Sequence, residues 1–304
     1  MNKQNIYDKL CEIIGEENIL VDEPMKNHTS FKIGGPADIL VTPTDENQLK
    51  EIMKYIKKES IPYFLMGNGS NLLVRDGGIR GVVVKIAQNY NKFEINENII
   101  KAQSGILLST LAKHIAKNCY KGFEFASGIP GTLGGAIAMN AGAYGGEMKD
   151  VVKSVKVLNQ QGEIVELSNE EMEFGYRTSL VNKEKLIVLE VKLSLEKGNY
   201  EDIKNILDDL TVKRTTKQPL NVPSAGSTFK RPEGYYAGKL IEDSGLKGVR
   251  LKGAQVSDKH SGFVINAGGA TAQDIMELIE FIKKTVYDKF KVELNEEVKI
   301  VGED

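Results

Sequence analysis

Apolar residues recur every three or four positions in several parts of the chain, which is the spacing of a helix with one buried face. One such helix is predicted after Thr44, which can act as its N-cap, and Pro62 is predicted to end it. A long helix is predicted to follow Thr271, because this second threonine precedes six apolar residues in helical register. The same spacing predicts three further helices, over residues 6–14, 107–117 and 199–216.

Short runs rich in β-branched and other apolar residues predict the strands. They are predicted at residues 37–41, 63–66, 81–86, 98–102, 151–158, 163–167, 186–195 and 298–301. Because strands and helices are mixed along the chain without strict alternation, we expect the α+β fold class. The strands give way to a predicted helix near residue 198, where we expect the main domain break.

The charge balance and the hydropathy exclude several classes of partner. The 304 residues include 40 Lys plus Arg against 42 Asp plus Glu, a net charge of -2, so we expect no nucleic acid partner. There is no run of 18 apolar residues and no apolar signal core near the first residues, so we expect no membrane association. Cys11 and Cys119 lack metal or redox spacing and the three histidines are scattered, so no metal site is expected. These features predict a cytoplasmic protein.

Glycine is unevenly distributed along the chain. Of the 30 glycines, eight lie between Gly122 and Gly146. Glycine allows positive φ angles and a close approach of the backbone to a ligand. This density therefore predicts a loop built around a bound molecule.

The first glycine motif, G-N-G-S-N at residues 67–71, follows a predicted strand. On its own, such a turn more often reverses the chain than binds a ligand. It is not a dinucleotide fingerprint, because G-x-G-x-x-G requires glycine at the position of Leu72. Its N–H groups and polar side chains can nevertheless bind an anion. The candidate cofactor residues here are Gly67, Asn68, Gly69, Ser70, Asn71 and Leu72.

The second motif extends from Ser127 to Gly146 and is more specific. Gly131 to Gly135 is expected to offer unhindered N–H groups to a pyrophosphate. The alternative is a tight buried loop in which small residues serve packing. We favour the ligand, because glycine at this density costs folding entropy with no expected packing return. The candidate cofactor residues are Ser127, Gly128, Ile129, Gly131, Thr132, Gly134, Gly135, Ala136, Asn140 and Gly142.

The two motifs, in this order and spacing, resemble the FAD-binding domain of the vanillyl-alcohol-oxidase-like flavoproteins. Further segments resemble one family within that group, the UDP-N-acetylenolpyruvoylglucosamine reductases. These segments are T-S-F-K-I-G-G-P-A at 29–37, F-G-Y-R-T-S at 174–179, S-A-G-S-T-F-K-R-P at 224–232 and L-N-E-E-V at 294–298. The resemblance covers residues 25–302, nearly the whole chain, with the motifs in the order of the family.

This resemblance implies a two-lobed FAD-binding domain and a C-terminal α+β substrate-binding domain. The first lobe is expected at residues 1–85, joined by the C-terminal strand 298–304, and the second lobe at 86–198. The substrate-binding domain is expected at 199–297. The FAD would be bound non-covalently, because residues 63–75 contain no histidine that could tether it.

The resemblance also implies a reaction in peptidoglycan precursor synthesis. The enzyme would use NADPH to reduce UDP-N-acetylglucosamine enolpyruvate, a UDP-sugar enolpyruvyl ether, to UDP-N-acetylmuramate. Hydride would pass from N5 of FAD to the terminal alkene carbon. The partners are therefore expected to be small molecules.

The resemblance assigns this chemistry to Arg177, Ser227 and Glu297. Each has an ordinary explanation by itself, as a strand-end arginine, a turn hydroxyl and a solvated carboxylate. Arg177 is expected to bind the substrate carboxylate by paired hydrogen bonds, and Glu297 to act as an acid or hydrogen-bond donor. Ser227 is expected to give a proton to the carbanionic carbon.

Cationic residues are expected to bind the UDP moiety. The resemblance places Lys217 near the diphosphate, with Lys230 and Arg231 as further candidates. Tyr176 is expected to contact either the flavin or the substrate. The chain resembles the shorter branch of the family, because Arg231 stands where the other branch has asparagine.

Two other functions stay open. The protein could be another FAD-dependent sugar or alcohol oxidoreductase, or a non-catalytic flavin-binding module. Ser227 and Glu297 in their motifs favour the reductase.

Overall fold

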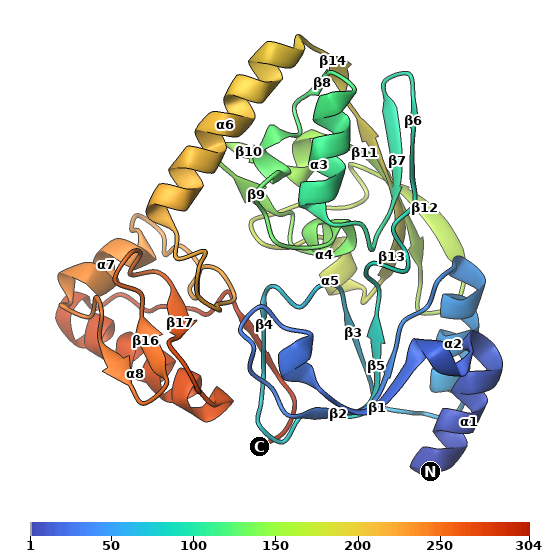
Figure 1. The fold of residues 1–304 in the computed structure, drawn as a ribbon, viewed down its shortest axis with the longest axis horizontal. Helices are drawn as coiled ribbons and strands as arrows, with labels where there is room; N and C mark the ends of the chain where they lie inside the picture. Colours follow the sequence, from blue (N-terminus) through green and yellow to red (C-terminus); the bar gives the residue numbers. More distant parts are fainter. Residues whose placement is uncertain (1) are drawn as a thin grey trace. The chain divides into compact units, whose positions relative to one another are not determined.

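A computed structural model describes residues 2–304, which divide into two compact units. Unit 1 contains the residues up to Leu20, together with Leu40–Asn68 and Val83–Arg214. Unit 2 contains Val21–Ile39, Gly69–Val82 and Thr215–Asp304. Each unit is thus assembled from three separate segments of the chain (Figure 1).

An antiparallel five-stranded sheet forms the centre of unit 1. Its register pairs Val155 with Val191 and Val191 with Ala102, so apolar side chains of three strands share one face. In spatial order the strands are β12 (Ile164–Ser168), β11 (Val152–Leu158), β13 (Ile187–Ser194), β7 (Ile99–Gln103) and β6 (Phe93–Asn96).

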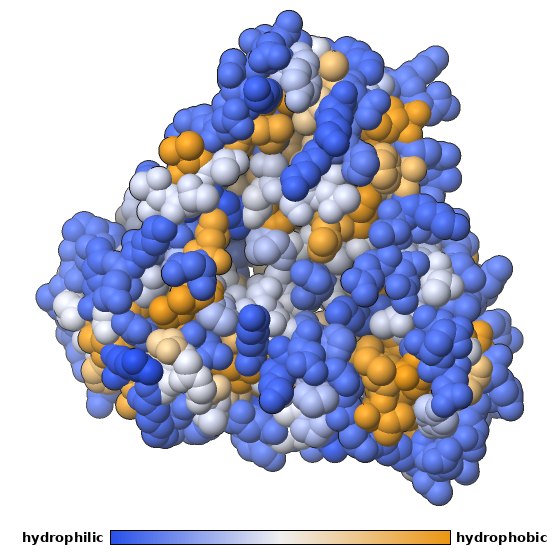
Figure 2. All heavy atoms as spheres, viewed as in Figure 1, coloured by the Kyte–Doolittle hydropathy of each residue, from blue (hydrophilic) through white to orange (hydrophobic). Residues whose placement is uncertain are grey.

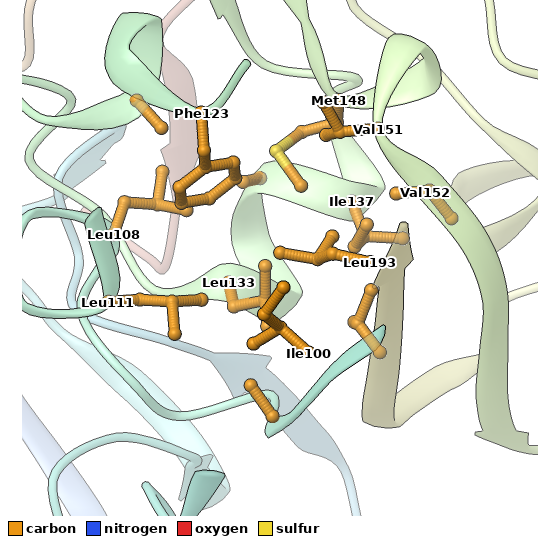
Figure 3. Packing of buried hydrophobic residues seen from close by; sticks show 14 of the residues in the cluster. Ile100, Leu108, Leu111, Phe123, Leu133, Ile137, Met148, Val151, Val152 and Leu193 are labelled. Carbon is orange, nitrogen blue, oxygen red and sulfur yellow. The ribbon is translucent and has the colours of Figure 1, made fainter. Parts of the chain in front are cut away.

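Two helices cover the apolar face of this sheet. Leu108 and Leu111 of α3 (Leu108–Lys117) and Leu133 and Ile137 of α4 (Leu133–Ala138) point toward sheet residues such as Leu193 (Figure 3). All five side chains are fully buried, and each buried side chain of this kind contributes about 1.5–3 kcal/mol of hydrophobic stabilisation. This cluster fixes the positions of the loops that carry the second glycine motif.

A pair of helices, α1 (Lys3–Ile14) and α2 (Glu46–Lys58), pack together in the same unit. The N-cap of α2 is Asp45, whose carboxylate accepts a hydrogen bond from the Gln48 main-chain N at 2.8 Å. The prediction of Thr44 as the cap is wrong by one residue, because the Thr44 hydroxyl donates instead to the Gln48 side chain at 3.0 Å. An aspartate at the N-cap also places negative charge at the positive end of the helix.

A four-stranded sheet has the order β1-β2-β5-β3. Its strands are β1 (Ile19–Pro24), β2 (Pro36–Val41), β5 (Ile79–Lys85) and β3 (Tyr63–Met66). The boundaries of the two units fall within β1, β2 and β5. The remaining short elements of the first two thirds are η1 (Glu16–Asn18), η2 (Met25–Asn27), β8 (Tyr120–Lys121), η3 (Glu124–Ala126), β9 (Gly142–Ala143), β10 (Gly146–Glu147), η4 (Met148–Asp150), α5 (Leu180–Lys183) and β14 (Glu196–Lys197). They are followed by the long helix α6 (Tyr200–Lys217).

Unit 2 combines a small antiparallel sheet with one long helix. The sheet has the order β15 (Arg250–Leu251), β16 (Ala254–Val256) and β17 (Val264–Asn266). It packs with α7 (Ala237–Asp243) and α8 (Ala272–Phe290), and Phe31 and Leu73 from early in the chain are buried in the same core. The last strand, β18 (Lys299–Val301), pairs in parallel with β4 (Leu72–Val74).

The start of α8 is capped twice. Thr271 is the N-cap and forms a reciprocal capping box with Asp274, so the predicted cap is confirmed. In addition, the carboxylate of Asp76 accepts hydrogen bonds from the N–H groups of Ala272 and Gln273 at 2.9 and 3.1 Å. A residue from the first third of the chain therefore satisfies two of the free donors of this helix.

The α+β class is confirmed, and every helix and strand predicted from sequence is present. Most boundaries agree within two residues, but α1 begins at Lys3 and not at residue 6, and α2 ends at Lys58, before the predicted end at Pro62. The sequence patterns missed the short elements of unit 2 before α8. They also missed α4, which forms inside the second glycine motif.

No helix among residues 2–304 has both the length and the apolar character required to cross a membrane. Hydrophilic residues cover most of the visible face of the molecule, and apolar residues occur there in separate small patches (Figure 2).

Candidate active site

The first glycine motif begins directly after β3, where Gly67 lies against Thr132 of the second motif. A Cβ atom on Gly67 would be 2.2 Å from Thr132 Oγ1, so only glycine fits. The two motifs are therefore in direct contact in unit 1, although they are far apart in sequence. Further along the first motif, the carbonyl of Gly69 accepts a hydrogen bond from the Ser30 main-chain N in unit 2, and Leu72 begins β4.

Three main-chain N–H groups at the centre of the second motif are already bonded within the protein. Gly134 N donates to the Ser104 carbonyl at 2.7 Å, and Gly131 N donates to the Ile129 carbonyl at 3.0 Å. Gly135 N donates to the hydroxyl of Thr132, the N-cap of α4, at 3.4 Å. The prediction that Gly131 to Gly135 offers unhindered N–H groups to a pyrophosphate is therefore wrong for these three residues.

Several glycines of the second motif are required for packing. A Cβ on Gly134 would be 2.9 Å from the Cβ of Ser104, and one on Gly146 would be 2.7 Å from the Phe125 ring. Such distances do not occur between real side chains. The expectation that these glycines bring no packing return is therefore wrong, because close contact inside unit 1 accounts for part of the glycine density.

Asn140 links the second motif to the segment of the candidate arginine. The residue is 2% exposed, with a φ of 40°, and its Nδ2 donates to the Glu147 carboxylate at 2.8 Å and to the Gly175 carbonyl at 3.2 Å. Its Oδ1 accepts from the Lys149 main-chain N at 2.9 Å. The Asn140 side chain thus holds the turn that begins at Gly175.

Arg177 occupies the tip of this tight turn. Gly175 and Thr178 exchange main-chain hydrogen bonds of 3.0 and 3.3 Å, which leaves Tyr176 and Arg177 between them. Arg177 adopts a φ of 56°, in the left-handed region that costs a residue with a side chain about 1–2 kcal/mol. Its guanidinium carbon lies 5.3 Å from the centre of the exposed Tyr176 ring. A half-buried arginine in a strained, doubly bonded turn has a well-defined position.

Arg214, near the end of α6, lies against the second motif from another direction. A Cβ on Gly128 would be 2.5 Å from its Nη1 and 2.8 Å from its Cδ. Burial lowers the pKa of the Arg214 guanidinium, and a smaller effect of Tyr144 opposes this. No sequence motif points to Arg214, although it stands three residues before the candidate Lys217.

Unit 2 brings the segments of Ser227 and Glu297 together. The main-chain N of Glu297 donates to the carbonyl of Thr228, the neighbour of Ser227, at 2.8 Å. A β-bridge between Phe229 and Glu296 continues this pairing. Thr228 and Phe229 are buried, which fixes the backbone, whereas Ser227 stays exposed. The two residues that the resemblance selects are thus neighbours in space, although they are far apart in sequence.

The first glycine motif is also tied to Glu297. Asn71 Nδ2 donates to the Glu297 carbonyl at 3.0 Å, and the Lys299 main-chain N donates to the Asn71 carbonyl at 3.0 Å. The adjacent Glu296 is engaged differently, because its carboxylate accepts a hydrogen bond from Lys283 at 2.8 Å. Burial opposes the ionisation of Glu296, but this bond holds its pKa below the usual range.

The candidate cationic residues for a UDP moiety all belong to unit 2 and are exposed. Lys217 is the last residue of α6, and Lys230 N donates to the Asn295 carbonyl at 2.8 Å beside the Glu297 segment. The Arg231 guanidinium stacks on the Tyr236 ring with 4.0 Å between its carbon and the ring centre. Arg231 Nε also donates to the Tyr235 carbonyl at 3.2 Å. Unit 2 therefore contains Ser227, Glu297 and the cations, and unit 1 contains the Arg177 turn.

Comparison with known proteins gives two family matches. The UDP-N-acetylenolpyruvoylglucosamine reductase C-terminal domain matches residues 218–301, and an FAD binding domain matches residues 37–168. Both lie where the motifs place the corresponding chemistry.

Full-length relatives carry the same name. The chain is 62% identical to the UDP-N-acetylenolpyruvoylglucosamine reductase of Clostridioides difficile over 304 residues, all of both chains. It is 59% identical to that of Alkaliphilus metalliredigens over 303 residues, again all of both chains. The crystal structure of the reductase from Thermus caldophilus superposes with a TM-score of 0.80 at 33% identity, covering 93% of this chain and 98% of that one.

Proposed function

The chain belongs to the UDP-N-acetylenolpyruvoylglucosamine reductase family, and we propose that it reduces UDP-N-acetylglucosamine enolpyruvate to UDP-N-acetylmuramate with electrons from NADPH. It is an FAD-dependent oxidoreductase of peptidoglycan precursor synthesis, so the family and the cofactor predicted from the motifs are confirmed. The observation in the structure that best supports the proposed chemistry is the pairing of Thr228 with Glu297. It brings together the backbone segments that carry Ser227 and Glu297.

The residues present fit FAD in two respects. Gly67 and Thr132 bring the two glycine motifs into contact at a point where no side chain could stand on the glycine. Arg214 adds a partly buried positive charge beside Gly128, which suits a cofactor with an anionic diphosphate. Bound FAD would supply the hydride for the reduction, and the residues of the chain hold and orient the reactants.

Arg177 and Glu297 act on the negative charge that develops on the substrate. Once hydride is added, charge spreads from the adjacent carbon into the carboxylate. The planar guanidinium of Arg177 binds a carboxylate by two parallel hydrogen bonds and is permanently charged. Glu297 donates a hydrogen bond to the same charge only in its protonated form, which requires burial or the charge of the substrate to favour that form. Both groups therefore stabilise the transition state more strongly than they stabilise the bound substrate.

Ser227 gives its hydroxyl proton to the carbon next to the site of hydride addition. Serine is a weak acid, so this step requires a strongly basic carbon and a hydroxyl that is already aimed at it. The neighbouring Thr228 supplies the fixed frame: its N donates to the Gly262 carbonyl and its Oγ1 accepts from Val264 N, both at 2.9 Å.

The remaining candidates bind the substrate outside its reacting part. Lys217, Lys230 and Arg231 contribute positive charge for the UDP diphosphate, and Tyr176 contacts the flavin or the substrate. We further propose two FAD-binding lobes, 1–85 with 298–304 and 86–198, a substrate-binding domain at 199–297, and a cytoplasmic location. The pairing of β18 with β4 supports the inclusion of the C-terminal strand in the first lobe.

An anaerobic titration tests the proposed function. The purified protein is loaded with FAD, reduced with NADPH without oxygen, and then mixed with the enolpyruvyl sugar nucleotide while the flavin absorbance is followed. We expect rapid reoxidation, matched by formation of the lactyl ether. Ser227→Ala should still bind FAD and accept electrons from NADPH, and should fail to turn over the sugar nucleotide.

Other outcomes identify the alternatives. A flavin that stays reduced with the sugar nucleotide but reoxidises with oxygen would indicate another sugar or alcohol oxidoreductase. A protein that binds flavin but retains its function when Arg177, Ser227 or Glu297 is replaced would be a binding module. Absence of flavin binding would contradict both enzymatic functions.

A further inference from the structure

Arg214 differs from the other cations of its helix. Its neighbour Lys213 forms an ordinary surface ion pair with Asp209, with N and O 2.6 Å apart and both side chains half exposed. Arg214 is instead directed inward, with Nη1 and Cδ in the space that a side chain on Gly128 would occupy. Among residues 2–304, no carboxylate forms a salt bridge with it.

This arrangement is unfavourable for the protein alone. A charge that is partly removed from water loses hydration, and the loss is offset only by an opposite charge or by hydrogen bonds. Among residues 2–304, Tyr144 is the one residue whose side chain affects the pKa of Arg214, and it carries a phenol and not a carboxylate. The structure thus supplies the cation of an ion pair without its anion.

The position of Arg214 indicates where the anion comes from. Gly128 belongs to the second glycine motif, and Tyr144 occupies the turn between β9 and β10 at the end of the same motif. In that turn Tyr144 and Gly145 have φ angles of 53° and 94°, as a tight hairpin turn of this kind requires. The loop at Gly128 and the end of α6 therefore meet at the guanidinium, and Tyr144 of this hairpin is near enough to affect its pKa.

We propose that Arg214 is a binding residue for the negative charge of FAD, held in place by Gly128. A planar guanidinium matches a phosphate through two parallel hydrogen bonds. The same chemistry suits the negative charge on the pyrimidine part of the reduced flavin ring. Gly128 is required because any side chain there would displace the guanidinium. The inference rests on the proposed use of FAD.

Equilibrium binding of FAD to the apoprotein, followed by quenching of flavin fluorescence, tests the inference. Arg214→Gln should weaken FAD binding by about 10- to 100-fold, since a charge-assisted hydrogen bond is lost. The FAD affinity of Arg214→Lys should lie between those of the wild type and of Arg214→Gln, because lysine keeps the positive charge but lacks the planar pair of donors. Lys213→Ala, the matched control on the exposed side of the same turn, should bind FAD as the wild type does.

Two probes distinguish the sources of negative charge. If Arg214 binds the diphosphate, Arg214→Gln should leave the affinity for riboflavin, which has no phosphate, and the flavin reduction potential unchanged. If it binds the reduced ring, Arg214→Gln should make the potential of bound FAD more negative. Either result supports the inference.

The stability of the apoprotein separates binding from folding. Because a partly buried charge without a partner is removed, Arg214→Gln should leave the melting temperature of the apoprotein unchanged or raise it. A larger fall than in Lys213→Ala would assign Arg214 to folding and contradict the inference. Unchanged FAD affinity and potential, or a loss confined to the binding of UDP, would also overturn it. If the wild type itself does not bind FAD, the proposed function fails instead.

Discussion

The side-chain amide of Asn71 donates a hydrogen bond to the main-chain carbonyl of Glu297, with nitrogen and oxygen 3.0 Å apart. The carbonyl of Asn71 in turn accepts a bond from the Lys299 main-chain N at 3.0 Å. Asn71, a residue of the first glycine motif, is thus bonded to the backbone of Glu297 and of Lys299, the two neighbours of Val298. Asn71 has a positioning role for Glu297 in addition to any contact with cofactor.

Asn71→Asp tests this positioning role. The variant has nearly the same shape, but its carboxylate cannot donate to the Glu297 carbonyl and repels it, so we expect kcat to fall about 10-fold. The fall should be confined to the reaction of the reduced enzyme with the sugar nucleotide, measured by stopped-flow absorbance. Reduction by NADPH should proceed at the rate of the wild type.

Asn71→Ala provides the control, because it loses the bond without adding repulsion and should be less impaired than Asn71→Asp. Flavin content is measured for both variants, so that loss of cofactor is not mistaken for slow chemistry. Wild-type turnover in a fully loaded Asn71→Asp enzyme would show that Glu297 does not depend on this bond.

The contact between Gly67 and Thr132 gives a second prediction. A methyl group on Gly67 would lie 2.2 Å from Thr132 Oγ1, the atom that caps α4. Gly67→Ala should therefore destabilise the protein by about 1–3 kcal/mol and weaken FAD binding. Thr132→Ala alone should cost about 1 kcal/mol through loss of the cap. In urea unfolding, the double variant should lose less stability than the sum of the losses of the two single variants, because Thr132→Ala removes the oxygen that clashes with the methyl group.

Gly135→Ala is the matched control for this cycle. It lies in the same motif, but a Cβ there would be 3.5 Å from Thr132 Oγ1, an ordinary contact. Alanine also favours a helix by up to about 1 kcal/mol over glycine, so the variant should be at least as stable as the wild type. Strictly additive losses in the Gly67→Ala and Thr132→Ala cycle would contradict a direct clash.

The φ of 56° at Arg177 predicts that two variants of this residue differ in stability but lose activity equally. Glycine adopts this conformation without strain, so Arg177→Gly should be about 0.5–1 kcal/mol more stable than Arg177→Ala in urea unfolding. The comparison with alanine removes the contribution of the lost guanidinium, because both variants lack it. Both should lose about 100- to 1000-fold in kcat if Arg177 stabilises the developing charge. Equal stability of the two variants would show that the turn relaxes around alanine.

Most of the long elements follow from the sequence because their signals are local. The apolar stripe and Thr271 together define α8, and the β-branched run at 187–194 defines β13. Both signals act within one element, so no knowledge of distant contacts is required. The short strands of unit 2 before α8 have only two or three residues each, too few to establish a period.

The parts of the site that could not be predicted depend on contacts between distant segments. Nothing near Asn71 in sequence indicates a bond to Glu297, and nothing near Gly128 indicates that Arg214 fills the space above it. The glycine density of the second motif correctly indicates close approach of backbones. The backbone at Gly134 and Gly146 nevertheless lies against protein and not against a ligand, because Ser104 and Phe125 of the same unit fill the space beside these glycines. A glycine signal shows that something lies close by and does not show whether it is ligand or protein.

His260 predicts a pH dependence of stability. Its Nδ1 accepts a hydrogen bond from the Gly262 main-chain N at 3.0 Å, and its ring packs edge-on against Phe263 at 5.0 Å. Burial lowers its pKa, and this effect outweighs the smaller, opposing influence of Glu242. The folded protein therefore holds the imidazole neutral at pH values where the unfolded chain, with a pKa near 6.5, binds a proton.

The sign of the effect follows from this difference in bound protons. Since the unfolded state binds more protons, stability is fully present above about pH 7 and falls as the pH decreases through 6.5 toward the lower pKa of the folded state. His260→Asn keeps an acceptor near the position of Nδ1 but has no group that titrates. Urea unfolding between pH 5 and 8 should show the variant to be less stable at pH 8, because the contact with Phe263 is lost. The difference should shrink toward pH 5. Parallel stability curves for the two proteins would show instead that His260 takes up its proton without cost in the folded state.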